Sequence, residues 1–170
     1  MIVSSFRRSM FLLMALVCMI SCDKDGLHLP TGKRKNTFQC KIGREIFKPY
    51  FKAGLFNNNE VLAVSNSRNY NRFSLYAHNQ KTSQSVAIEF PYVSGTGTYK
   101  LQQYRYRGTY DAGFRNPGWY TTDSVHTGEL VIIKCDMARN IYAGTFYFTG
   151  IDPNTKRIVN VTNGRFDVKE

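Results

Sequence analysis

The segment IYAGTFYFT, at residues 141–149, carries the pattern that decides the fold. Phe146 and Phe148 fall on one side of an extended chain and Thr145 and Tyr147 on the other, because successive side chains of a strand alternate. This period of two is typical of a strand with one buried face in an antiparallel sheet. The segment therefore predicts a half-buried strand.

The chain on either side of this segment continues the pattern. Gly128–Asp136 precedes it and Arg157–Val168 follows it, with short turns between, which predicts a C-terminal three-strand meander. In the last of these strands the alternation places Phe166 on the buried face and Asp167 on the exposed face.

Seven further runs are rich in β-branched or aromatic residues, and none of the chain shows a helical period over more than two turns. These runs are Phe38–Ile42, Glu45–Phe47, Val61–Ser65, Arg72–His78, Ser85–Phe90, Thr98–Gln102 and Trp119–Thr122. The pattern predicts an all-β fold, an antiparallel β-sandwich or small open barrel of about eight to ten strands.

Turn-forming residues separate the predicted strands. Gly43-Arg44 fits a type II′ hairpin turn, which needs glycine first. Asn163-Gly164 is a turn signal of the same kind, and it predicts a break within the last strand region.

The first residues of the chain resemble a bacterial lipoprotein signal. Arg7 and Arg8 precede the apolar run Met10–Ile20, which is too short to cross a bilayer as a helix, since that takes about 20 residues. The run ends at Met19-Ile20-Ser21-Cys22, which resembles a lipobox. We therefore expect residues 1–21 to be a lipoprotein signal peptide and Cys22 to be lipidated after cleavage.

The residues after Cys22 indicate a tether and an address. Residues 22–36 are polar and aperiodic, which predicts a flexible tether, and residues 37–170 form a single predicted β domain. Acyl chains anchor a protein stably when more than one is attached. We expect a protein bound to the membrane through its N-terminal lipid, in the cell envelope and at the outer membrane, facing either the periplasm or the surface.

Two cysteines remain in the predicted domain. Cys40 shares a strand face with Phe38, and Cys135 shares one with Val131 and Ile133, so both point toward one predicted core. Disulfides persist in an oxidising envelope, whereas free cysteine is also a common core residue. The sequence leaves both alternatives open: a disulfide between Cys40 and Cys135, or two packed thiols.

The two ends of the predicted domain resemble a known family. The patterns are Asn36-Thr37-Phe38-Gln39-Cys40 near its start, then Gly144-Thr145-Phe146-Tyr147-Phe148, and finally Thr162-Asn163-Gly164-Arg165-Phe166-Asp167. They are similar to an uncharacterised family of small Bacteroidetes lipoproteins, a domain of unknown function. The resemblance implies a β fold and an envelope address, and it implies no catalytic residue.

Motifs for chemistry are few. No nucleophile elbow or phosphate loop occurs, and His78 and His126 have no histidine or carboxylate at the i+2 or i+4 spacing of metal ligands. The sequence thus predicts no metal, no cofactor and no enzyme activity. The net charge of +11 usually prompts a nucleic-acid hypothesis, which the envelope address argues against.

One stretch combines aromatic rings with arginines. Residues 102–120 hold four of the eleven tyrosines, the single tryptophan and three arginines. Such side chains carry much of the binding energy at interfaces. The candidate binding residues are Tyr104, Tyr106, Arg107, Trp119 and Tyr120. The alternative is a long β-hairpin whose tyrosines cover the core.

Taken with the address, this stretch predicts a lipid-anchored binding module of the cell envelope, with a glycan or an envelope protein as its partner. The alternatives are a structural or accessory subunit of an envelope complex and, less favoured, a small hydrolase.

Overall fold

A computed structural model describes residues 30, 32, 36–51 and 61–170. The predicted signal peptide (1–21), Cys22 and most of the predicted tether lie outside the described residues. No helix of the described part has the length and the apolar character that crossing a membrane requires.

The described chain is all-β, as predicted, and contains eleven strands. They are β1 Thr37–Ile42, β2 Glu45–Phe47, β3 Leu62–Ser67, β4 Arg72–Asn79, β5 Gln84–Phe90, β6 Gly97–Leu101, β7 Arg107–Asp111, β8 Trp119–Thr121, β9 Gly128–Asp136, β10 Ile141–Ile151 and β11 Ile158–Lys169. Ten correspond to the predicted strands, while β7 lies within residues 102–120, for which the sequence offered a long β-hairpin as an alternative. Its sequence RGTYD hides the alternation, because glycine at 108 takes the place of an inward side chain.

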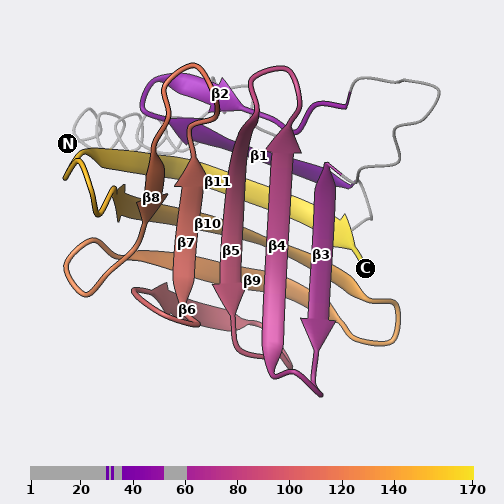
Figure 1. Ribbon diagram of the computed structural model, residues 1–170. Coiled ribbons are helices and arrows are strands. Elements are labelled where there is room, and N and C mark those ends of the chain that lie inside the picture. Colours follow the sequence, from indigo (N-terminus) through magenta and orange to yellow (C-terminus); the bar gives the residue numbers. More distant parts are fainter. Residues whose placement is uncertain (1–29, 31, 33–35, 52–60) are drawn as a thin grey trace, which may run out of the picture.

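The strands form one antiparallel sheet that curls into a half-barrel. The two halves of the curled sheet form two layers. In Figure 1 the front layer consists of β3, β4, β5, β7 and β8, which stand upright. The rear layer runs across the view behind them and contains β1, β11, β10 and β9, with β2 and β6 at its edges. The layers are joined where Ile151 of β10 pairs with Thr121 of β8.

The predicted C-terminal meander is confirmed. β9, β10 and β11 pair in chain order, and β11 then pairs with β1. The predicted break at Asn163-Gly164 is wrong, because both residues lie inside β11. There the register shifts against both neighbours and Asn163 has a φ of +52°. The residues that signal a turn form a β-bulge in a continuous strand, since one class of bulge, like a tight turn, holds a residue at positive φ.

The predicted faces of β9 are wrong for a similar reason. Leu130 and Ile132 are buried and Ile133 is 49% exposed, although the alternation predicted Val131 and Ile133 inside. The register of β9 against β10 skips Ile133 and so marks a bulge there, which resets the period of two.

The two cysteines of the domain are free thiols in the structure. Cys40 is fully buried, and burial raises the pKa of its thiol well above the usual range. Cys135 is half-buried and donates to Met137 Sδ at 3.4 Å. Of the two alternatives that the sequence left open, the described structure therefore has the packed thiols.

The core lies between the two layers and is held by aromatic side chains that fit against glycines. Gly144 pairs with Phe166 and Gly164 with Phe146 across β10 and β11. A Cβ on Gly164 would lie 2.5 Å from the Phe146 ring, so each glycine leaves room for the ring of its partner. The buried positions of Phe146, Phe148 and Phe166 are as predicted.

The predicted exposure of Asp167 is wrong. The alternation placed it outside, yet its side chain is fully buried. Phe166 and Val168 on either side of it both belong to the core, so the Asp167 side chain points to the other face of the sheet and is buried there. The first hairpin agrees with expectation: Gly43 has a φ of +60°, and Ile42 pairs with Glu45 across the two-residue turn.

Candidate functional site

The front layer has an outer face, which consists of the side chains that point away from the core. In β4 the buried side chains Phe73, Leu75 and Ala77 point to the core. The residues between them therefore point away from it, since successive side chains of a strand alternate. These residues are Arg72, Ser74, Tyr76 and His78.

Register extends this pattern across the layer and defines three rows of outward residues. The arginine row contains Ser65, Ser74, Glu89 and Arg107. The tyrosine row contains Ala63, Tyr76, Ala87, Thr109 and Thr121. The tryptophan row contains His78, Ser85, Asp111 and Trp119.

The arginine row and its edge carry a charge cluster. Glu89 accepts from Arg72 through one carboxylate oxygen and from Arg107 through the other. The Glu89 side chain is 18% exposed, whereas those of Arg72 and Arg107 are 58% and 43% exposed. Each guanidinium has five N–H donors, and Glu89 uses few of them. The pairs thus hold both guanidinium groups in place and leave donors that face solvent.

One wall of the site is the turn between β3 and β4. Asn71 N–H donates to Arg68 O at 3.1 Å, and Asn71 has a φ of +45°, which asparagine tolerates better than most residues. Its side-chain oxygen accepts from Tyr92 N–H at 3.2 Å. The turn is therefore fixed to the segment after β5, and Tyr70 projects from it with 81% of its surface exposed.

The opposite wall is the turn between β6 and β7. Tyr106 N–H donates to Gln103 O at 3.1 Å, and Tyr104 has a φ of +56°. Glycine normally occupies this conformation, and a bulky residue there is strained by about 1–3 kcal/mol. Tyr104 is also 81% exposed, so its ring does not offset that strain by burial. Strain of this kind, kept at an exposed tyrosine, points to a functional constraint.

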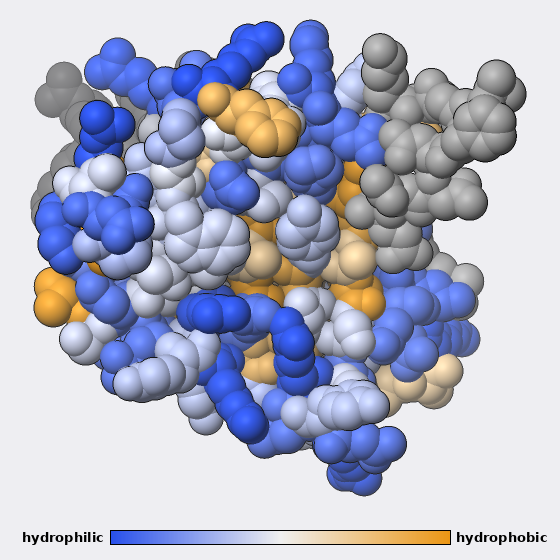
Figure 2. Space-filling model, in the orientation of Figure 1, coloured by the Kyte–Doolittle hydropathy of each residue, from blue (hydrophilic) through white to orange (hydrophobic). Residues whose placement is uncertain are grey.

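Between the two walls lies an open groove of about 890 Å³. It is lined by hydroxyls, phenol rings and three arginines, namely Ser65, Ser67, Tyr70, Asn71, Arg72, Ser74, Glu89, Phe90, Tyr104, Arg105 and Arg107. Figure 2 shows strongly hydrophilic side chains over the lower part of this face and, beside them, a hollow in which apolar atoms are visible. Three arginines against one glutamate make the groove cationic.

The predicted binding residues separate in space. Tyr104 and Arg107 line the groove, and Tyr106 lies next to it with its ring against Phe90 at 4.8 Å between centroids. Trp119 is 52% exposed but stands in the tryptophan row, at the other end of β7 from Arg107. Tyr120 points the other way and stacks on Tyr110, whose burial raises the pKa of its phenol to about 12.

The sequence prediction missed half of the groove. Tyr70 comes from the turn between β3 and β4, Arg72 from β4 and Glu89 from β5, all outside residues 102–120. The alternation in the sequences of β4 and β5 is enough to put Arg72 and Glu89 on the polar face. What it lacked was the pairing of β5 with β7, which brings Glu89 opposite Arg107.

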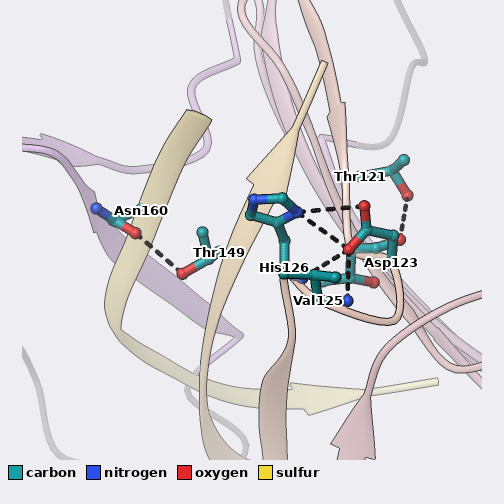
Figure 3. Close-up of polar contacts among 7 residues, drawn as sticks. Thr121, Asp123, Val125, His126, Thr149 and Asn160 are labelled. Carbon is teal, nitrogen blue, oxygen red and sulfur yellow. Dashed lines mark hydrogen bonds and ion pairs between the residues drawn. The ribbon is translucent and has the colours of Figure 1, made fainter. Parts of the chain in front are cut away.

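A second polar cluster lies in the loop between β8 and β9 (Figure 3). Asp123 Oδ1 accepts the backbone N–H groups of Val125 and His126 at 2.8 and 2.6 Å, and the His126 ring lies 3.1 Å from it. These bonds, led by the one from the His126 N–H, hold the pKa of Asp123 below its usual range. The i,i+3 spacing explains why a search at i+2 and i+4 passed over this pair. Its bonds stay within one loop and serve to fix it.

Metal-binding groups do not gather in the described part of the chain. Among residues 36–51 and 61–170, no three side chains of histidine, cysteine, aspartate or glutamate come together in a way that could hold an ion. The groove itself has one carboxylate, Glu89, and both of its oxygens accept from arginine. Most glycosidases use a pair of carboxyl groups, and the residues that line the groove include one carboxylate.

The fold and the groove together define an all-β domain with one open, cationic face. Residues 34–168 match the family described as "Domain of unknown function (DUF6252)", and the chain belongs to that family. No curated protein and no solved structure matches the chain closely enough to support an inference.

Proposed function

We propose that this protein is a binding module whose ligand is an acidic glycan, held in the groove of the front layer. One observation carries the proposal: three arginines, two of them held in place by Glu89, stand beside exposed tyrosine rings and serine hydroxyls. Guanidinium groups bind carboxylates through paired N–H donors, and aromatic rings pack against the apolar face of a sugar ring.

The surface favours a glycan over a protein ligand because of its composition and shape. The centre of a protein interface is depleted of serine and glutamate, although tyrosine and arginine are enriched there. The groove instead has a floor of serine hydroxyls and charged groups, and it is recessed between two fixed turns. A chain of hydroxylated rings suits such a recess.

We also propose the address that the N-terminal sequence predicts. A lipidated Cys22 would tether the domain to the cell envelope, at the outer membrane, where acidic polysaccharides are accessible. The sequence Met19-Ile20-Ser21-Cys22 supports this step. Labelled palmitate should enter the wild-type protein and not Cys22→Ala, and equal labelling of both would contradict it.

Calorimetric titration of the full-length protein in detergent tests the ligand class. Polygalacturonate or alginate should bind, whereas neutral dextran should not. Arg107→Ala should weaken binding by about tenfold or more, since it removes a charge-assisted contact. Arg139→Ala is the matched control, because Arg139 is an exposed arginine in the turn after β9. Equal affinity of Arg107→Ala and wild type, or equal binding of dextran, would contradict the proposal.

A role as an accessory subunit is the second candidate, and one observation favours it. Phe114 is 88% exposed in the turn between β7 and β8, and Trp119 follows on the same hairpin. Exposed aromatic residues of this kind anchor protein interfaces. Photo-crosslinking from the neighbouring exposed position 115 in cells tests this role, which predicts one dominant crosslinked protein that is lost when Phe114→Ser is added.

A further inference from the structure

We infer that the binding site extends beyond the groove, across the tyrosine and tryptophan rows, and takes an oligosaccharide that carries its acidic unit at one end. This inference rests on the proposed function, since it assumes that the groove binds the acidic unit. It adds the length, the polarity and the position of the rest of the ligand.

The tyrosine row forms a platform next to the groove. Tyr76 stands in this row, 37% exposed, between Ala63 on β3 and Ala87 on β5. Both neighbours are alanine, so no long side chain covers the two faces of the tyrosine ring from within the row. Tyr76 also stacks on His78 at 6.3 Å between centroids and 9° between planes, which restrains its orientation. A restrained ring with open sides can pack against a sugar without a large loss of side-chain entropy.

The tryptophan row ends the platform with a second exposed ring. Trp119 lies across from Asp111 and is 52% exposed. Ser85 and Asp111 separate it from His78, so the row has low side chains between two aromatic ones. A ligand that leaves the groove along β4 passes Tyr76, and it must also cross β5 and β7 to reach Trp119 on β8.

The length of the platform sets the size of the ligand. From Arg72 to His78 the chain of β4 advances by six residues, or about 20 Å at the rise of a β-strand. A single sugar fills only part of that length. The surface is matched in length by a short oligosaccharide.

Charge sets the direction of the ligand. The three arginines lie at the groove end, whereas the tryptophan row contains Asp111, whose carboxylate accepts from Gly113 N–H at 2.9 Å. An acidic unit is attracted at the first end and repelled at the second. The ligand therefore places its carboxylate between the arginines and neutral, hydroxylated units over the two other rows.

The test compares three probes on the full-length protein in detergent: glucuronic acid, xylotetraose, and xylotetraose bearing one glucuronic acid. We expect the conjugate to bind about tenfold more tightly than glucuronic acid, because it adds ring packing. Tyr76→Ala should lower the affinity for the conjugate to that for glucuronic acid and leave the latter unchanged. Tyr147→Ala is the matched control, since Tyr147 is 49% exposed on β10.

The single tryptophan of the chain supplies a second readout. The conjugate should change the emission of Trp119, and glucuronic acid alone should not, because it stays at the arginine end. Equal affinities of glucuronic acid and the conjugate, with unchanged emission for both, would overturn the extended site and leave the proposed function standing. Failure of both acidic probes to bind would count against the proposed function and the extension together. Equal binding of xylotetraose and the conjugate would mean that the acidic unit adds nothing, which would overturn the assigned direction and count against the proposed function as well.

Discussion

The β10–β11 pair and the outer face of the front layer place their aromatic residues in opposite surroundings. In the rear layer Phe146 and Phe166 fit against the glycines opposite them and are buried. On the front layer Tyr76 and Tyr104 stand exposed, and Tyr104 is held at a positive φ. The first arrangement stabilises the curled sheet, whereas the second leaves rings available to a ligand. Mutations in the two regions should therefore separate stability from binding.

The largest effect is expected from Phe166→Ala. Its ring is 1% exposed and fills the space above Gly144, so truncation leaves a cavity that costs about 3–5 kcal/mol of unfolding free energy. Urea denaturation measures this loss. Tyr147→Ala, at an exposed position of the same layer, should change stability by less than about 0.5 kcal/mol. Equal losses for the two variants would break the comparison.

Gly144→Ala should have the next largest effect. An added Cβ would lie 2.1 Å from the Val131 carbonyl oxygen and 2.8 Å from the Phe166 ring. The strands must shift to admit it, which costs about 1–3 kcal/mol. Gly95→Ala is the matched control, because nothing lies within 4 Å of its Cβ position. A similar small change at both sites would show that the glycine–phenylalanine fit is unimportant.

Tyr104→Gly tests the front layer, and unlike the two preceding variants it should gain stability. Glycine adopts the φ of +56° without strain, so this change should raise stability by up to about 1 kcal/mol while it weakens glycan binding. Tyr104→Ala removes the same ring and keeps the strain, so it should weaken binding without the gain in melting temperature. A loss of stability in both variants would mean that the ring packs on the domain.

The smallest expected effect is on the stability of the domain in acid, and it comes from Asp152 in the turn after β10. Asp152 accepts N–H bonds from Asn154 and Thr155 at 2.8 and 3.2 Å, and these hold its pKa below its ordinary value of 3.8. A carboxyl with a lowered folded-state pKa stabilises the fold above its ordinary pKa, and this stability is lost as the pH falls through the lowered value. Asp152→Asn should therefore flatten the fall of melting temperature below pH 3.8. Parallel curves for both proteins would argue against this role.

Periodicity predicted most of the fold, and bulges account for its errors. The alternation of β4 and β5 was enough to separate the buried from the outward residues. At Ile133 the same rule failed, because a single extra residue in a strand resets the alternation. No local pattern distinguishes an Asn-Gly bulge from an Asn-Gly turn, since both need positive φ at that position.

The groove was only half predictable for a different reason. Residues 102–120 drew attention through their composition, and two of the five candidates, Tyr104 and Arg107, do line it. The other wall comes from the turn that holds Tyr70, and the two turns face each other only because β5 pairs with β7 and β4 pairs with β5. Such pairings are long-range contacts, which strand patterns do not specify.

The pairing of the first strand with the last one sets the order in which the domain can be completed during synthesis. Thr37 of β1 lies opposite Asp167 of β11, and Lys169 N–H donates to Asn36 Oδ1 at 3.3 Å. The β1–β2 hairpin leaves the ribosome first, and its main neighbour leaves last. Until then one edge of β1 and one edge of β10 lack their partner strand, and open edges recruit strands from other chains. A chain that stops before residue 158 would keep both edges open, and we expect it to aggregate rather than fold.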